Sequence, residues 1–76
     1  MATHYHVRQF IWDNGRWIDL GPVTAITTET SHAAAERVTG VPMVSVGPID
    51  RVALKVWERG KARKAEDVRH YWRAGL

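Results

Sequence analysis

Bulky apolar residues alternate with polar ones on both sides of Asn14-Gly15, and this pattern predicts a β-hairpin. Residues 4–13 are rich in Tyr, Val, Phe, Ile and Trp, which favour a strand. Asn14 and Gly15 suit the two positive-φ positions of a type I′ turn. A second strand is expected from Arg16 towards Thr28. Gly21-Pro22 should interrupt it as a bulge or bend, because proline cannot donate to a central ladder.

A two-residue turn also predicts which side chains meet across the hairpin. The expected pairs are Asp13–Arg16, Trp12–Trp17, Ile11–Ile18, Phe10–Asp19 and Gln9–Leu20. One side of the hairpin then carries an ordinary core set, Tyr5, Val7, Ile11, Ile18 and Leu20. The other side is polar near its start and aromatic near the turn, with His4, His6, Arg8, Phe10, Trp12 and Trp17.

A short, alanine-rich helix is predicted from Glu29 to Val38. Thr28 or Thr30 can cap its first turn, and the charge of Glu29 suits the positive end of the helix dipole. Its inward stripe is expected to be small: Ser31, Ala34, Ala35 and Val38. Gly40 is placed to end the helix in a left-handed conformation, and Pro42 prevents its continuation.

The middle of the chain predicts a third strand, Val41–Val46, followed by a turn at residues 47–50. Residues 51–57 fit two alternatives. As a strand they place Val52, Leu54 and Val56 on one side. As a helix, with Pro48 in its first turn, the segment places Ile49, Val52, Ala53, Val56 and Trp57 on one stripe. We favour the strand, because β-branched residues and a tight preceding turn fit it better.

The last element is predicted to be a basic helix over residues 62–74. Its apolar stripe would be Ala65, Val68, Tyr71 and Trp72. The expected fold is therefore α+β, a small single domain over residues 1–76. It is a ββαββα sandwich in which an antiparallel sheet, built from two strand pairs, carries the short Ala-rich helix and the basic C-terminal helix.

Composition excludes several classes of protein. The chain has 76 residues and no cysteine, which rules out disulfides, thiolate nucleophiles and cysteine-based zinc sites. No apolar run approaches the roughly 20 residues that span a membrane, and the N-terminus lacks the apolar segment of a signal peptide. We therefore expect a cytoplasmic protein with no membrane partner. A domain this small often gains stability by oligomerisation.

Charge is distributed unevenly along the chain. Residues 1–50 hold three Lys/Arg and five Asp/Glu, whereas residues 51–76 hold eight Lys/Arg and three Asp/Glu. The candidate basic patch is Lys61, Arg63, Lys64, Arg69 and Arg73. Basic residues interleaved with aromatic ones suit a nucleic-acid backbone, but no established nucleic-acid-binding motif is present. An ordinary solvated surface explains the same charges.

The sequence offers little for catalysis or for a cofactor. Ser31 and His32 are adjacent, and adjacent helical residues do not face each other. His4 and His6 alternate on a strand and share a face, but a metal site needs a third or fourth ligand that no local rule supplies. No glycine-rich phosphate loop is present. We expect no enzyme activity and no cofactor.

The aromatic side of the hairpin is the candidate interface, formed by Phe10, Trp12 and Trp17. Two arrangements are open. Either the C-terminal helix covers these side chains, or they stay open and bind a second copy or another protein. The sequence therefore favours a small protein-interaction module that self-associates. The alternative is a nucleic-acid-binding domain that uses the basic segment 51–76.

Overall fold

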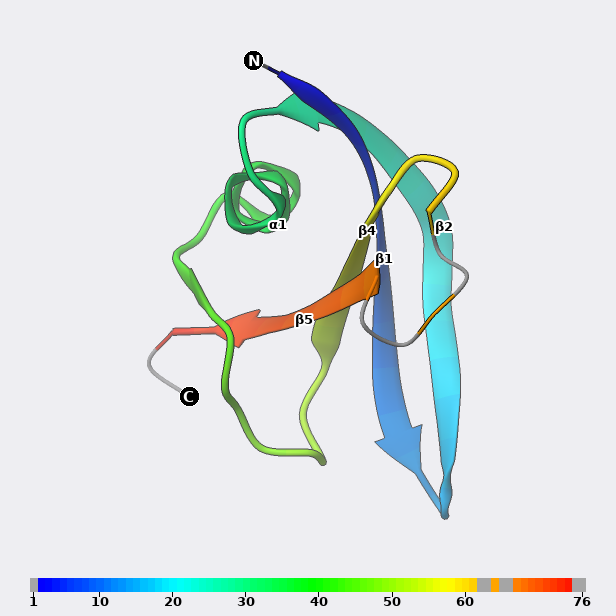
Figure 1. Cartoon of the computed structure of the whole chain (residues 1–76). Helices are drawn as coiled ribbons and strands as arrows, with labels where there is room; N and C mark the ends of the chain where they lie inside the picture. Colours follow the sequence, from blue (N-terminus) through cyan, green and yellow to red (C-terminus); the bar gives the residue numbers. More distant parts are fainter. Residues whose placement is uncertain (1, 62–63, 65–66, 75–76) are drawn as a thin grey trace.

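The computed structural model, which describes residues 2–61, 64 and 67–74, is an α+β fold with one five-stranded antiparallel sheet and one helix (Figure 1). The elements follow the chain as β1 (Thr3–Asp13), β2 (Arg16–Thr28), α1 (Ser31–Thr39), β3 (Met43–Val44), β4 (Ala53–Glu58) and β5 (Val68–Arg73). Within the sheet the order is β2-β1-β4-β5-β3. The long strand β1 therefore has a partner on each side, and α1 covers one face of the sheet.

The predicted hairpin and its register are confirmed. All five expected pairs, from Asp13–Arg16 to Gln9–Leu20, are present between β1 and β2. Asn14 has φ 50° and Gly15 has φ 80°, as a type I′ turn requires. The bulge is also confirmed, since the register shifts between Val7 and Gln9, opposite Gly21, whose φ is 73°.

The tip of this hairpin projects beyond the rest of the sheet. β4 pairs with β1 from Tyr5 to Phe10, so residues 11–18 form a two-stranded ribbon to which no other described strand is added (Figure 1). This explains why Ile11 and Ile18, expected in the core, are only half-buried and lie outside the cluster of buried residues. The side-chain alternation was predicted correctly, but the helix does not reach that far.

The helix is capped by two of the residues that the sequence indicates, Thr30 and Gly40. Thr30 is extended and accepts a hydrogen bond from the Ala33 backbone N–H at 3.0 Å, so it is the N-cap rather than Thr28. Gly40 adopts the left-handed conformation, with φ 72°, and its N–H donates to the Glu36 carbonyl. The helix starts at Ser31, two residues later than expected.

The core lies between α1 and one face of the sheet. Ala34 and Ala35 are fully buried, and their small size lets the helix lie close to the strands. The buried residues from the other elements are Val7, Met43, Leu54, Val56 and Tyr71. Ser31 Oγ lies 2.6 Å from Tyr71 Oη, which links the start of the helix to β5. The predicted inward stripe of the helix is therefore confirmed.

The two middle strands differ in how well they were predicted. The strand alternative for residues 51–57 is confirmed from Ala53 onward, because Ala53–Glu58 is β4, whereas Arg51 and Val52 precede the strand. The expected strand Val41–Val46 shortens to Met43–Val44, and it pairs with β5 rather than with β4. The turn after Pro48 is present, with the Arg51 N–H donating to the Pro48 carbonyl at 3.3 Å. The strands on either side of this turn, β3 and β4, both pair with β5, so they do not form the second strand pair that the sequence predicts.

The predicted C-terminal helix over residues 62–74 is wrong. Residues 62–63 and 65–66 lie outside the described residues, but Val68–Arg73 is strand β5, hydrogen-bonded to β4. The segment satisfies both periods, since Val68, Tyr71 and Trp72 also fit a helical stripe. As a strand it supplies partners for the backbone groups of β4 and inserts Tyr71 into the core. The fold is therefore ββαβββ over the described residues.

Candidate functional site

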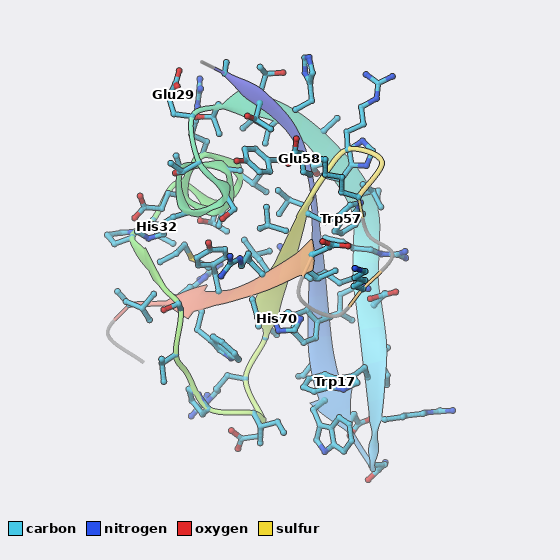
Figure 2. The ribbon with its side chains drawn as sticks, in the orientation of Figure 1. Trp17, Glu29, His32, Trp57, Glu58 and His70 are labelled. Atoms are coloured by element: carbon cyan, nitrogen blue, oxygen red, sulfur yellow. The ribbon has the colours of Figure 1, made fainter. Side chains whose placement is uncertain are left out.

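The face of the sheet turned away from α1 collects most of the aromatic side chains. Val7, Leu54, Val56 and Tyr71 point towards the helix, so the residues that alternate with them point away. We call this surface the open face. All four tryptophans lie on it: Trp12, Trp17, Trp57 and Trp72. Figure 2 shows His70 between Trp57 and Trp17, on a different part of the molecule from His32 beside the helix.

The three predicted interface residues form one contact group on the open face. The ring centroids of Trp12 and Trp17 are 4.7 Å apart, and those of Phe10 and Trp17 are 5.0 Å apart, both edge to face. Phe10 is only 5% exposed, whereas Trp17 is 52% exposed. Trp12 is half-buried. Phe10 is thus covered by its own neighbours, and Trp17 remains accessible.

β5 contributes to this group in place of the predicted helix. The His70 ring lies 5.2 Å from the Phe10 ring, measured between centroids. β4 and β5 pair as far as Leu54 and Tyr71, so the next residue of each strand, Ala53 and Trp72, points to the open face, and Ala53 pairs with Phe10. We call the set the aromatic cluster: Phe10, Trp12, Trp17, His70 and Trp72. No helix of the described residues lies across it.

The loop 45–52 extends the apolar surface next to the aromatic cluster. The indole Nε1 of Trp72 donates to the Pro48 carbonyl at 3.0 Å, and the ring packs directly on Gly47. The ring lies so close to Gly47 that a side chain at this position would have no room. The hydrogen bond and this close packing together hold the loop against β5. Val46 is 81% exposed and Ile49 is 57% exposed. The loop 45–52 lies at the same end of the molecule as the tip of the β1–β2 hairpin (Figure 1).

A charged triad borders the aromatic cluster. Lys55 Nζ lies 2.6 Å from one carboxylate oxygen of Asp19, and Arg8 lies 3.6 Å from the other. The hydrogen bond from Lys55 lowers the pKa of Asp19, helped by the charges of Lys55 and Arg8 and opposed by burial. Arg8 Nε also donates to the Gly21 carbonyl at 3.0 Å. These charges are largely satisfied among themselves.

His70 sits between the triad and the aromatic rings. Burial lowers its pKa below the ordinary value of 6.5, and the nearby charge of Lys55 acts in the same direction. The ring is therefore neutral at neutral pH. It adds aromatic surface to the cluster rather than charge.

The other histidines do not assemble a metal site in the part of the chain that the structure describes. His4 Nδ1 lies 2.8 Å from Thr27 Oγ1, and His6 packs edge to face on Trp57. Among the described residues no group of three His, Asp or Glu side chains converges. On the opposite side, His32 Nε2 donates to the Met43 carbonyl at 2.7 Å, while Ser31 is engaged with Tyr71. Ser31 and His32 thus have separate partners.

The structure describes four of the five residues of the predicted basic patch, and two of them, Lys61 and Arg69, line one pocket together with Glu58 and Asp67. Arg63 lies outside the described residues. Lys61 pairs with Glu58 at 3.3 Å, and Lys64 lies in the segment between β4 and β5. Arg69 and Arg73 lie on the side of β5 that faces α1, because they alternate with His70 and Trp72. The cations of β5 are therefore separated from the aromatic cluster by the thickness of the sheet.

His70, Trp72 and the loop 45–52 were missed as parts of the site. The signal that would have found the first two is the alternation of Val68, His70 and Trp72, which was masked by the helical spacing of Val68, Tyr71 and Trp72. No local pattern places the loop next to the hairpin. That placement follows from the pairing of Phe10 with Ala53 and from the contact of Trp72 with Gly47.

Among the residues described, no helix combines the length and the apolar character needed to cross a bilayer. Comparisons of the chain with family models, with curated proteins and with solved structures find no match.

Proposed function

We propose that this protein is a small interaction module that self-associates through the aromatic cluster and the adjacent loop 45–52. The observation that carries the proposal is the exposure of Trp17, which is 52% accessible while it touches both Trp12 and the buried Phe10. Contiguous exposed apolar surface on a small domain marks a binding site, and tryptophan is enriched among residues that dominate binding energy.

A second copy of the chain is the occupant that fits the charge of this surface. The hairpin tip carries one acid and one base, Asp13 and Arg16, which face each other. Two hairpins related by a two-fold axis can exchange these partners, so that Asp13 of each copy meets Arg16 of the other. The two charges cancel, so the hairpin tip has no net charge that would attract a strongly charged partner. The chain as a whole carries a net charge of +3, so its remaining surface is less suited to self-contact.

The energetics require more than Trp17 alone. A tryptophan side chain buries on the order of 150–250 Å². Covering the exposed half of Trp17 in each protomer would thus contribute about 2–3 kcal/mol per copy. A standard interface buries about 800 Å² per partner. Against the total accessible surface of 5290 Å², this is about one-seventh of the molecule. We therefore expect Val46 and Ile49 to take part.

Sedimentation velocity over a concentration series tests the proposal. The wild type should shift from monomer to dimer as its concentration rises through the micromolar range. Trp17→Ser and Ile49→Ser should both weaken the dimer at least about tenfold, because each removes exposed apolar area. Val23→Ser is the matched control: Val23 is 43% exposed, on β2 outside this surface, so its loss should leave the dimer unchanged.

Two results would contradict self-association. One is a monomer at every concentration. The other is a dimer that Trp17→Ser and Ile49→Ser leave intact. The Ile49→Ser variant is included because Ile49 is exposed in a loop, so its replacement should not unfold the protein. Titration of the same samples with a labelled single-stranded oligonucleotide tests the alternative function. Binding that falls steeply with salt would favour the basic segment 51–76.

A further inference from the structure

A second site lies on the other face of the sheet, at the C-terminal end of α1. There a cavity of about 350 Å³ opens between the helix end at Thr39, strands β1 and β4, and the loop that precedes β4. Its floor is apolar, because Met43 and Leu54 are 4% and 2% exposed. The volume is within the range of small-molecule sites and matches that of about a dozen waters.

Two arginines line this cavity, and among the residues that the structure describes no acid does. Arg51 comes from the loop before β4 and Arg73 from the end of β5. Within residues 2–61, 64 and 67–74, neither guanidinium has a hydrogen-bond or ion-pair partner. The nearby carboxylate of Glu36 is already engaged, since it accepts from the Met43 N–H at 3.1 Å.

The negative end of the α1 dipole does not neutralise the charges of Arg51 and Arg73. A helix C-terminus carries about half a negative charge, and this one is capped by Gly40. The Thr39 hydroxyl donates to the Ala35 carbonyl at 3.0 Å, which satisfies a further acceptor. The helix end thus offsets only part of the charge of Arg51 and Arg73. An excess of positive charge remains at the rim of an apolar cavity.

We propose that this cavity binds a small organic carboxylate. The guanidinium groups of Arg51 and Arg73 hold the carboxylate, because their planar forks match its two oxygens. The apolar body of the ligand lies on Met43 and Leu54. Gln9, which faces Leu54 across the β1–β4 pair, adds an amide at the rim. The cavity contains no residue of the aromatic cluster, which lies on the open face, but it shares Arg51 and Val52 with the loop 45–52 of the proposed dimer surface.

Backbone amide NMR spectra of the full chain, titrated with hexanoate, test this assignment. Signals from residues 51–54 and from Met43 should move and saturate. Arg51→Gln and Arg73→Gln should each weaken hexanoate at least about tenfold, since each removes a charged hydrogen-bond donor. Arg59→Gln is the matched control, because Arg59 is an exposed arginine beyond the other end of β4 and should have no effect. Hexanol, which lacks the charge, should bind at least about tenfold more weakly than hexanoate.

Four outcomes would overturn the proposal. These are no shift at millimolar hexanoate, equal binding of hexanol, equal binding of inorganic phosphate, and an equal loss in Arg59→Gln. Equal binding of hexanol would mean that the arginines contribute nothing, and equal binding of phosphate would mean that the apolar floor contributes nothing. Trp17→Ser should leave hexanoate binding unchanged, which separates this result from the test of self-association.

Discussion

Replacing Gly47 with alanine tests how tightly the loop 45–52 is held against the sheet. A Cβ atom at this position would lie 2.6 Å from Cβ and Cδ1 of Trp72, and closer still to Cγ. Real Cβ contacts are essentially never shorter than 3.0 Å, so the loop or the indole must move by several tenths of an ångström. The same movement disturbs the hydrogen bond from Trp72 Nε1 to the Pro48 carbonyl, now 3.0 Å.

The expected cost follows from these two losses. Overpacking of this kind costs about 1–3 kcal/mol, and a lost hydrogen bond about 1 kcal/mol. Because a surface loop relaxes more easily than a core, we expect the free energy of unfolding to fall by about 2 kcal/mol. For a domain of this size that lowers the melting temperature by roughly 8–16 °C.

Thermal and urea unfolding followed by circular dichroism measure this change, and the indole N–H signal of Trp72 in an NMR spectrum reports the hydrogen bond. Ser45→Ala is the control, since Ser45 is an exposed neighbour in the same loop. A loss below about 0.5 kcal/mol, with the Trp72 signal unmoved, would refute the reasoning, because it would mean that the ring does not pack on Gly47.

Two further predictions concern β5. Tyr71→Phe should lower the free energy of unfolding by about 1 kcal/mol, because it removes the 2.6 Å hydrogen bond to Ser31. Ser31→Ala should lower it by a similar amount. Strictly additive effects in the double variant would argue against the bond. The lowered pKa of His70 means that its protonation favours the unfolded chain. Stability should therefore be full above pH about 6.5 and fall as the pH drops through the folded-state pKa. His70→Gln should flatten this part of the pH profile in urea titrations, and an unchanged slope would assign the effect to another group.

Local chemistry was enough to predict the hairpin and the helix. A two-residue Asn-Gly turn allows one register, and that register placed Phe10, Trp12 and Trp17 together before any tertiary contact was known. Thr30 and Gly40 ended the helix for equally local reasons, since each satisfies backbone groups within four residues of itself. The sequence by itself therefore determined the side-chain alternation of β1 and β2, and with it three members of the aromatic cluster.

Tertiary structure decided the state of the C-terminal segment and the composition of both sites. Val68–Arg73 satisfies helical and strand periods alike, and what selects the strand is the backbone of β4, which needs partners, together with the core, which needs Tyr71. The choice brings His70 and Trp72 to the aromatic cluster and Arg73 to the cavity with Arg51. Contacts between segments so far apart in the chain depend on the order of the strands in the sheet, and that order cannot be predicted from rules that span only a few residues.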